Sequence, residues 1–386
     1  MDCCTFSLVL VFFFFLIYIP TSTSVPFVLL HGVGQTCADK KVSYFTNQLS
    51  NWSATQGYCL ESSYSRFNSW FLTLESQASI VCSRVKEMNE LKQGFHMIGL
   101  SQGAIIARAV LEFCDGAPPV KNLITLAGAH AGTASTPFCR FKVLCALSAY
   151  VLNFFIYTNF VQDHLAASGY IRIPSNELKY FSKSKFLPKL NNEIPDQRNE
   201  TYKERFTGLE NLVLIMCKDD KVLIPRETSW FGHFSKTIFS EVLRPQQTSL
   251  YVEDWIGLKA LDEAGKVKYI GVRGDHLDIS DNDMKEHIVP YLKIKKSTEL
   301  VRYQESKHIS KEMSTKVMVP YREPMHIPKE MSTQEVSYRK PKRITGPMNK
   351  ELKLDRATTP RVVYNWRPTM LTVRRQCLKY VQVIRR

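Results

Sequence analysis

The sequence lacks a zinc or thioredoxin-type motif, an apolar run of membrane-spanning length and a strongly basic globular part. No CxxC pair occurs among the ten cysteines, so zinc-binding and thioredoxin-type motifs have no support. The one long apolar run, Phe6 to Ile19, is short for a membrane span. Residues 297–386, with 20 Lys and Arg against 8 Asp and Glu, hold +12 of the net charge of +15, which leaves +3 for residues 1–296. The basic balance therefore gives no reason to expect a nucleic acid as partner of the globular part.

The N-terminal segment also lacks basic residues, because no Lys or Arg precedes the apolar run and Asp2 is acidic. In other respects the run suits the central part of a secretory signal, with small residues Ser22 and Ser24 near a cleavage point. The alternative is an uncleaved anchor. We expect any membrane contact of the protein to be at most peripheral. Since the strand-like VPFVLLHG begins at once, an anchored chain would have almost no linker. We predict a cleaved signal peptide at residues 1–24.

Two further features agree with a secretory route. Asn51-Trp52-Ser53 and Asn199-Glu200-Thr201 are glycosylation sequons. Cleavage after residue 24 would leave eight cysteines, which is compatible with disulfides in an oxidising compartment. We expect a lysosomal, vacuolar or extracellular protein.

Apolar segments alternate with helix-like ones between residues 25 and 292, which predicts a mostly parallel sheet with helices on both faces. The strand candidates are continuous apolar runs, typical of strands buried on both faces. They are PFVLLH at 26–31, FHMIGL at 95–100, NLITLAG at 122–128, NLVLIMC at 211–217 and KYIGV at 268–272, with GYCLESSY at 57–64 as a sixth.

The alternation of strands and helices predicts a domain at residues 25–296. It is interrupted at about residues 133–206, which predicts a helical cap inserted into this domain. Residues 297–386 form a Lys- and Arg-rich tail in which HISKEMST recurs as HIPKEMST, and we expect this tail to be disordered. A nucleic-acid or anionic-membrane arm is an alternative for the tail.

The segment FHMIGLSQGAII places Ser101 in a GxSxG pattern. A buried strand ends at Leu100, and a helical pattern follows. A strand-to-helix turn with this pattern is the nucleophile elbow of α/β hydrolases, in which Gly99 and Gly103 relieve crowding. The context predicts Ser101 as a nucleophile, whereas an ordinary serine between glycines is the alternative.

A serine hydroxyl needs a base that a carboxylate orients, and in α/β hydrolases the acid and then the base follow later strands. KDDKVLIP after residue 217 offers Asp220, which we prefer to Asp219, and RGDHLDIS after residue 272 offers His276. We expect Asp275 and Asp278 to be loop or surface carboxylates. Five of the other eight histidines fit the base less well. His31 belongs to a loop after the first strand, His130 to the rim, His287 to a terminal helix, and His308 and His326 to the tail.

The oxyanion hole needs two backbone N–H groups directed at the developing negative charge. One should come from Gln102, directly after the serine. The loop HGVGQ at 31–35 should supply the other, with Val33 as the donor and Gly32 and Gly34 permitting the turn. A plain glycine-rich turn is the alternative for this loop.

With these pieces in place, residues 25 to about 293 resemble the palmitoyl-protein thioesterases, lysosomal α/β hydrolases that cleave fatty acyl thioesters from cysteine. The matching stretches are VPFVLLHGVGQTC, FHMIGLSQGAIIARAVLEFC, PPVKNLITLAGAHAGTASTPFC, ETSWFGHF, TSLYVEDWIGLKALDEAGKV and GDHLDIS. The resemblance implies an α/β-hydrolase fold with Ser101 as nucleophile, Asp220 as acid, His276 as base, and Val33 and Gln102 as oxyanion donors. It calls for no metal or cofactor.

The resemblance also implies two disulfides, Cys82–Cys114 and Cys139–Cys145. The family's adjacent cysteine pair after the HG loop is here Cys37 followed by Ala38, so that bridge is absent. Cys59 is a candidate partner for Cys37. We expect Cys217 to be a buried free thiol.

The implied reaction is the hydrolysis of palmitoyl-cysteine thioesters of proteins or peptides through an acyl-enzyme, with an apolar groove lined by LSAYVLNFFIYTNF in the cap. For residues 147–161 of this segment, simple packing in the core is the alternative. A carboxylester lipase or acyl-CoA thioesterase would use the same triad. The non-enzyme alternative is an inactive lipid-binding protein, against which the intact Ser101, Asp220 and His276 argue.

Overall fold

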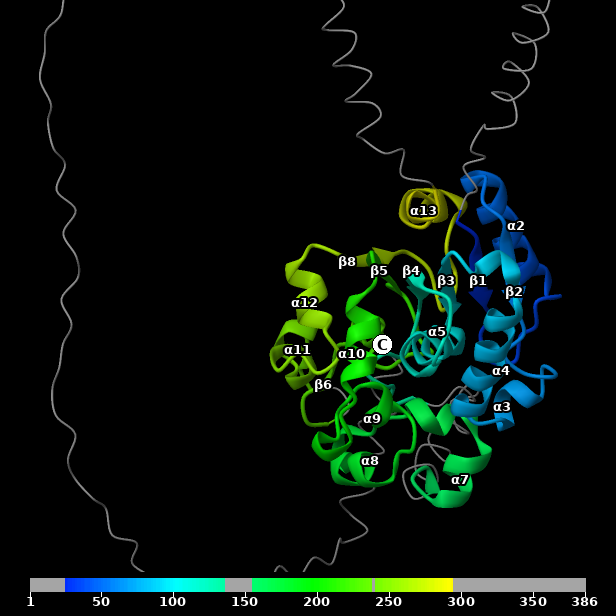
Figure 1. Ribbon diagram of the computed structural model, residues 1–386. Coiled ribbons are helices and arrows are strands. Elements are labelled where there is room, and N and C mark those ends of the chain that lie inside the picture. The colour runs from blue at the N-terminus through cyan, green and yellow to red at the C-terminus, as the bar shows by residue number, and fades with distance from the viewer. Residues whose placement is uncertain (1–24, 136–154, 238–239, 294–386) are drawn as a thin grey trace, which may run out of the picture. The chain divides into compact units, whose positions relative to one another are not determined.

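A six-stranded parallel sheet forms the centre of the computed structural model, which describes residues 25–135, 155–237 and 240–293 (Figure 1). The strand order is β2-β1-β3-β4-β5-β8. The strands are β1 (Phe27–Leu30), β2 (Gly57–Leu60), β3 (Phe95–Leu100), β4 (Val120–Leu126), β5 (Asn211–Cys217) and β8 (Val267–Val272). The six predicted strands are confirmed with small shifts of their ends. The largest shift is in β2, which ends at Leu60 instead of residue 64.

Composition explains why these segments form inner strands. Every residue of FVLL in β1 and of FHMIGL in β3 is buried, because both faces of the sheet are covered. In the parallel register, Leu30 of β1 is aligned with Leu60 of β2 and with Gly99 of β3. The residues that follow these three strands therefore meet at one edge of the sheet.

Helices cover both faces of the sheet. The chain moves from β1 to β2 in one direction and from β2 to β3 in the other. Right-handed crossovers therefore place α2 (Lys40–Ser53) on the face opposite to α4 (Leu74–Glu87) and α5 (Gln102–Phe113). In Figure 1, α4, α5 and α10 (Glu200–Thr207) are neighbours in front of the sheet. The last helix, α13 (Asp281–His287), packs against α2.

Shorter elements complete the described part of the chain. The helices are α3 (Asn68–Phe71), α7 (Asn159–His164), α8 (Glu177–Lys183), α9 (Leu187–Leu190), α11 (Ser249–Val252) and α12 (Leu258–Glu263), and β6 (His233–Phe234) and β7 (Val242–Leu243) form a hairpin. The 3-10 turns are Asn89–Leu91, Ala166–Tyr170, Pro174–Asn176, Pro195–Gln197, Arg226–Trp230, Pro245–Gln247 and Val289–Tyr291. Among the described residues, no helix combines the length and the apolar character that crossing a membrane requires.

The insertion between β4 and β5 is helical where the structure describes it, as expected for a cap. Ion pairs connect its own segments: Arg172 contacts the buried Glu193 at 3.1 Å and the exposed Glu177 at 2.8 Å. Arg108 of α5, which is fully buried, donates to Asn191 Oδ1 at 3.0 Å. Because α5 begins directly after Ser101, this bond connects the insertion to the helix that carries the GxSxG turn.

Candidate active site

Ser101 lies in the turn between β3 and α5, with φ of 51° and ψ of −117°. A residue with a side chain seldom adopts positive φ, so this turn is strained. Its glycine neighbours are required by packing. A Cβ on Gly99 would lie 2.4 Å from Ala104 Cα, and one on Gly103 would lie 2.3 Å from the carbonyl oxygen of Leu30. The strand-to-helix turn expected from the sequence is present.

His276 and Asp220 lie beside Ser101. His276 follows β8, and its Nε2 is 2.8 Å from Ser101 Oγ. Its Nδ1 is 2.7 Å from Oδ2 of Asp220, which follows β5 and has a fully buried side chain. The carboxyl ends of three parallel strands thus bring the three side chains into one chain of contacts. This is the contact pattern of Ser-His-Asp triads.

The structure distinguishes Asp220 from Asp219. Oδ1 of Asp220 accepts the N–H groups of Val222 (2.7 Å) and Leu223 (3.0 Å), which leaves Oδ2 directed at His276. Asp219 is exposed, and its carboxylate accepts the N–H of Gly274. Asp219 therefore helps to shape the loop after β8, but it does not reach the imidazole.

The loop of residues 31–37 after β1 lies against the serine. A Cβ on Gly32 would be 3.3 Å from Ser101 Cβ. The N–H of Gly32 donates to Gln35 Oε1 at 2.9 Å, whereas no hydrogen bond within the described residues engages the N–H of Val33. Val33 lines the same cavity as Ser101, so its N–H is available there.

Gln102 is the first residue of α5, where a backbone N–H has no acceptor within the helix. Its buried side chain is bonded elsewhere: Nε2 donates to the carbonyl oxygen of Ser69 in α3 at 2.9 Å, and Oε1 accepts from Tyr170 Oη at 3.2 Å. Gln102 is therefore held by α3 and by the cap. No sequence pattern points to Tyr170, because its partner lies 68 residues away.

Ser101 and His276 border a cavity of about 380 Å³. This volume lies within the usual range for small-molecule sites. Apolar side chains from both halves of the sheet line it: Val42, Phe45, Leu100, Ile105, Leu126, Leu223 and Leu277. Trp70 and Tyr170 add aromatic surface. The cavity therefore presents an apolar wall next to a hydroxyl group, which suits an acyl chain.

The predicted groove lining is wrong for residues 155–160. None of them lines the cavity: Ile156 and Tyr157 are buried in the core, whereas Phe155 and Phe160 are exposed. Tyr157 Oη also accepts the N–H of Ile173 at 3.1 Å, a bond within the insertion itself. The core-packing alternative holds for Ile156 and Tyr157 but not for the exposed Phe155 and Phe160. Residues 147–154 lie outside the described residues.

Comparison with known proteins now identifies the family. The family model for palmitoyl protein thioesterase matches residues 26–276. Palmitoyl-protein thioesterase 1 of Caenorhabditis elegans is 32% identical over 272 residues, which cover 69% of this chain and 90% of that protein. The chain belongs to the palmitoyl protein thioesterase family. It is a thioester hydrolase that takes acylated substrates.

Two other relatives support the assignment. Palmitoyl-protein thioesterase 3 of Dictyostelium discoideum is 32% identical over 272 residues, covering 70% of this chain and 90% of that protein. A lysosomal thioesterase homologue of Drosophila melanogaster is 31% identical over 208 residues, covering 52% of this chain and 69% of that protein.

The described part of the thioesterase contains two disulfides. Cys82–Cys114, implied by the family resemblance, connects α4 to the end of α5. Cys37–Cys59 connects the loop after β1 to β2, so Cys59 is the partner of Cys37. Two disulfides are typical of proteins from oxidising compartments. Cys217 is buried and free, and burial raises the pKa of its thiol to about 11. Cys139 and Cys145 lie outside the described residues.

The competing histidines of the thioesterase have other surroundings. His130 was expected at the rim, but it is fully buried, stacked on Phe231 with ring centroids 4.9 Å apart. Burial also holds its pKa well below the usual value, so the expectation was wrong. Its Nε2 is bonded to Thr125 at 3.0 Å. His287 ends α13, and His308 and His326 lie outside the described residues.

The two sequons occupy different settings. Asn51 is exposed in α2, and Asn199 caps α10, where its Oδ1 accepts the N–H of Thr201 at 2.9 Å. Glycosylation at both sites stays a prediction.

Proposed function

We propose that Ser101 is the nucleophile of this thioesterase, His276 its general base and Asp220 the carboxylate that orients the base. The observation that carries the proposal is the pair of contacts made by the imidazole, 2.8 Å to Ser101 Oγ and 2.7 Å to Asp220 Oδ2. Asp220 fixes the tautomer in which Nε2 can take a proton.

In the first step, Oγ of Ser101 attacks the thioester carbonyl while His276 takes its proton. The carbonyl oxygen becomes negative, and the N–H groups of Val33 and Gln102 stabilise it. The C–S bond then breaks, and the cysteine sulfur of the substrate leaves with the proton from His276. An acyl group remains on Ser101.

In the second step, water attacks the acyl-enzyme. His276 takes a proton from the water, the oxyanion forms in the same place, and the fatty acid leaves as Ser101 regains its proton. The apolar walls of the cavity support a long-chain acyl group such as palmitoyl as the preferred substrate.

The first experiment measures thioester hydrolysis by the wild type and by Ser101→Ala on a palmitoyl-cysteine peptide. We expect the substitution to lower kcat by at least about 10³-fold, because the nucleophile is lost. A fluorophosphonate should label the wild type but not the variant. Wild-type protein that neither hydrolyses the thioester nor takes the label would contradict the proposal and favour an inactive lipid-binding protein.

A second set of assays compares the palmitoyl-cysteine peptide with palmitoyl-CoA and with p-nitrophenyl palmitate. The highest kcat/KM on the peptide is expected. If the oxygen ester were cleaved faster, the protein would act as a carboxylester lipase instead.

We also propose that residues 1–24 are a secretory signal and that the mature enzyme works in a lysosome, a vacuole or outside the cell. Support comes from the two disulfides and from a relative named as a lysosomal thioesterase. N-terminal sequencing of the protein from its native source should begin near Val25. An intact Met1 in the mature protein would contradict cleavage.

A further inference from the structure

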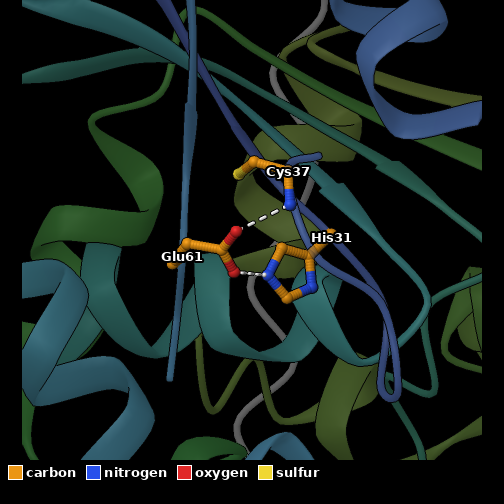
Figure 2. A group of neighbouring side chains, drawn as sticks. All are labelled: His31, Cys37 and Glu61. Atoms are coloured by element: carbon orange, nitrogen blue, oxygen red, sulfur yellow. Dashed lines mark hydrogen bonds and ion pairs between the residues drawn. The ribbon is translucent and has the colours of Figure 1, made fainter. Parts of the chain in front are cut away.

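Glu61 directly follows β2, and its carboxylate connects the two ends of the loop of residues 31–37, which we call the oxyanion loop (Figure 2). Its Oε2 lies 2.7 Å from His31 Nε2, at the start of the loop. Its Oε1 accepts the N–H of Cys37 at 2.7 Å, at the end of the loop. Between these two attachments lie Gly32 and Val33, next to Ser101.

The contacts of His31 imply a hydrogen between its Nε2 and the Glu61 carboxylate. Both ring nitrogens of His31 face oxygen atoms, since Nδ1 is 2.9 Å from the carbonyl oxygen of Gly32. A carbonyl oxygen can only accept, so Nδ1 carries a hydrogen. The contact between Nε2 and Glu61 then needs a second hydrogen, held by either partner. In both arrangements the pair has no net charge, which suits an imidazole whose side chain is completely buried.

Other contacts act on the middle and the end of the oxyanion loop. The N–H of Gly34 donates to Ser69 Oγ at 2.8 Å, and Arg66 Nη1 donates to the carbonyl oxygen of Gly34 at 2.8 Å. The Cys37–Cys59 disulfide secures the far end. Among the described residues, Glu61 alone hydrogen-bonds both to the His31 side chain and to the backbone of Cys37.

A metal site is the competing interpretation of the same side chains, because His31, Cys37 and Glu61 form a group of potential ligands. Two observations oppose it. The sulfur of Cys37 is bonded to Cys59, which removes the thiolate that a metal would need. The Nε2–Oε2 distance of 2.7 Å is that of a direct hydrogen bond.

We propose that Glu61 is a positioning residue for catalysis, which fixes the backbone N–H of Val33 by bridging His31 and Cys37. The proposal rests on the proposed function, in which Val33 N–H stabilises the oxyanion. Glu61 does not touch the substrate. Its effect is on the distance between the donor and the oxyanion, and displacement of a catalytic group by about 1 Å can lower a rate by roughly 10²-fold.

Two conservative substitutions separate geometry from charge. Glu61→Gln keeps the length of the side chain: Oε1 can accept from Cys37, and Nε2 can donate to a neutral His31. Glu61→Asp keeps the charge but is one methylene shorter, so it cannot reach both partners. We expect Glu61→Gln to keep kcat within about twofold and Glu61→Asp to lower kcat about 10- to 100-fold. KM should change little in both, since the acyl cavity does not include Glu61.

Amide hydrogen exchange provides a measurement that does not depend on activity. In Glu61→Asp, exchange should become faster at residues 31–37 and stay unchanged in β3, whereas Glu61→Gln should match the wild type. Glu75→Asp is the matched control, because Glu75 is an exposed carboxylate that pairs with Lys189 and should affect neither measurement.

The outcomes are distinct. Loss of kcat in Glu61→Asp but not in Glu61→Gln, together with faster loop exchange, supports the proposal. Equal activity in both variants, or greater loss in Glu61→Gln than in Glu61→Asp, overturns it. If the wild type itself hydrolyses no thioester, the proposed function fails. Loop exchange in the two variants then still decides whether Glu61 holds the loop.

Discussion

At the scale of single residues, Asp220 is the clearest case of a side chain whose function depends on all its bonds. One carboxylate oxygen accepts two backbone N–H groups, and the other accepts from His276. An amide at this position could satisfy only part of this set, because its nitrogen cannot accept. Replacement of the carboxylate should therefore change the tautomer of His276.

We expect Asp220→Asn to lower kcat for palmitoyl thioester hydrolysis by about 10³- to 10⁴-fold, as tautomer loss does in other triads. Asp219→Asn, a control one residue away, should keep kcat within about twofold. Steady-state kinetics of both variants test this. A large loss in Asp219→Asn with little loss in Asp220→Asn would reverse the assignment of the acid.

His96 is a residue at which pH should alter stability. Burial, followed by the charge of Lys121, lowers the pKa of this imidazole to about 4. The unfolded chain binds a proton near the ordinary value of 6.5, so between about pH 6.5 and 4 the unfolded state holds more protons than the folded state. The contribution of His96 to stability is present above pH 6.5 and is lost as the pH falls toward 4.

His96→Phe removes this titration and keeps a ring in the buried position. The difference in unfolding free energy between pH 7 and pH 4.5 should then be smaller by about 2 kcal/mol than in the wild type. Urea unfolding at the two pH values measures it. An unchanged difference would show that His96 does not titrate as its burial implies.

The role of a residue could be predicted from the sequence where it follows from the order of the strands, and could not where it follows from packing between distant segments. Ser101, Asp220 and His276 were predicted together because parallel strands end at one edge, and residues directly after them must meet there. His130 and Ile156 are buried by side chains that are distant in the sequence, and no periodic pattern of apolar residues predicts their burial. Glu61 was missed because a single acid after a short strand has no motif.

At the scale of elements, the two disulfides connect different parts of the domain. Cys37–Cys59 joins the oxyanion loop to β2, next to the catalytic edge, whereas Cys82–Cys114 joins α4 to the far end of α5. They close loops of similar length, with sequence separations of 22 and 32 residues. Their contributions to stability should therefore be similar, and their effects on catalysis should differ.

Replacing either pair of cysteines by alanine should lower the unfolding free energy by about 3 kcal/mol. Only the Cys37→Ala/Cys59→Ala protein should also lose kcat, because its oxyanion loop loses one anchor. Thermal unfolding and thioester kinetics of the two double variants check this. Equal loss of kcat in both proteins would indicate a general effect of destabilisation.

At the scale of the whole molecule, the last described residues are hydrogen-bonded to segments from the first half of the domain. Thr55 donates to the carbonyl oxygen of Leu292 at 3.0 Å, and Asn122 donates to that of Tyr291 at 2.7 Å. The end of the described domain is thus bonded both to the loop before β2 and to β4. The described residues that line the candidate site lie between Gly32 and Asp278.

Removal of residues 297–386 should accordingly leave kcat and KM for the palmitoyl-cysteine peptide within about twofold of the full-length values. Kinetics of the two forms test this, and cell fractionation of both would show whether their location differs. A fall in kcat in the shortened protein would assign the tail a part in catalysis.

The strand order has one more consequence for the enzyme. β2 and β8 are the two outermost strands, and a residue of the proposed mechanism follows each of them: Glu61 follows β2 and His276 follows β8. The outermost strands of a sheet are hydrogen-bonded to a neighbouring strand on one side only. Detachment of either strand should lower turnover while the middle of the sheet is still intact, so enzyme activity monitors the full width of the sheet.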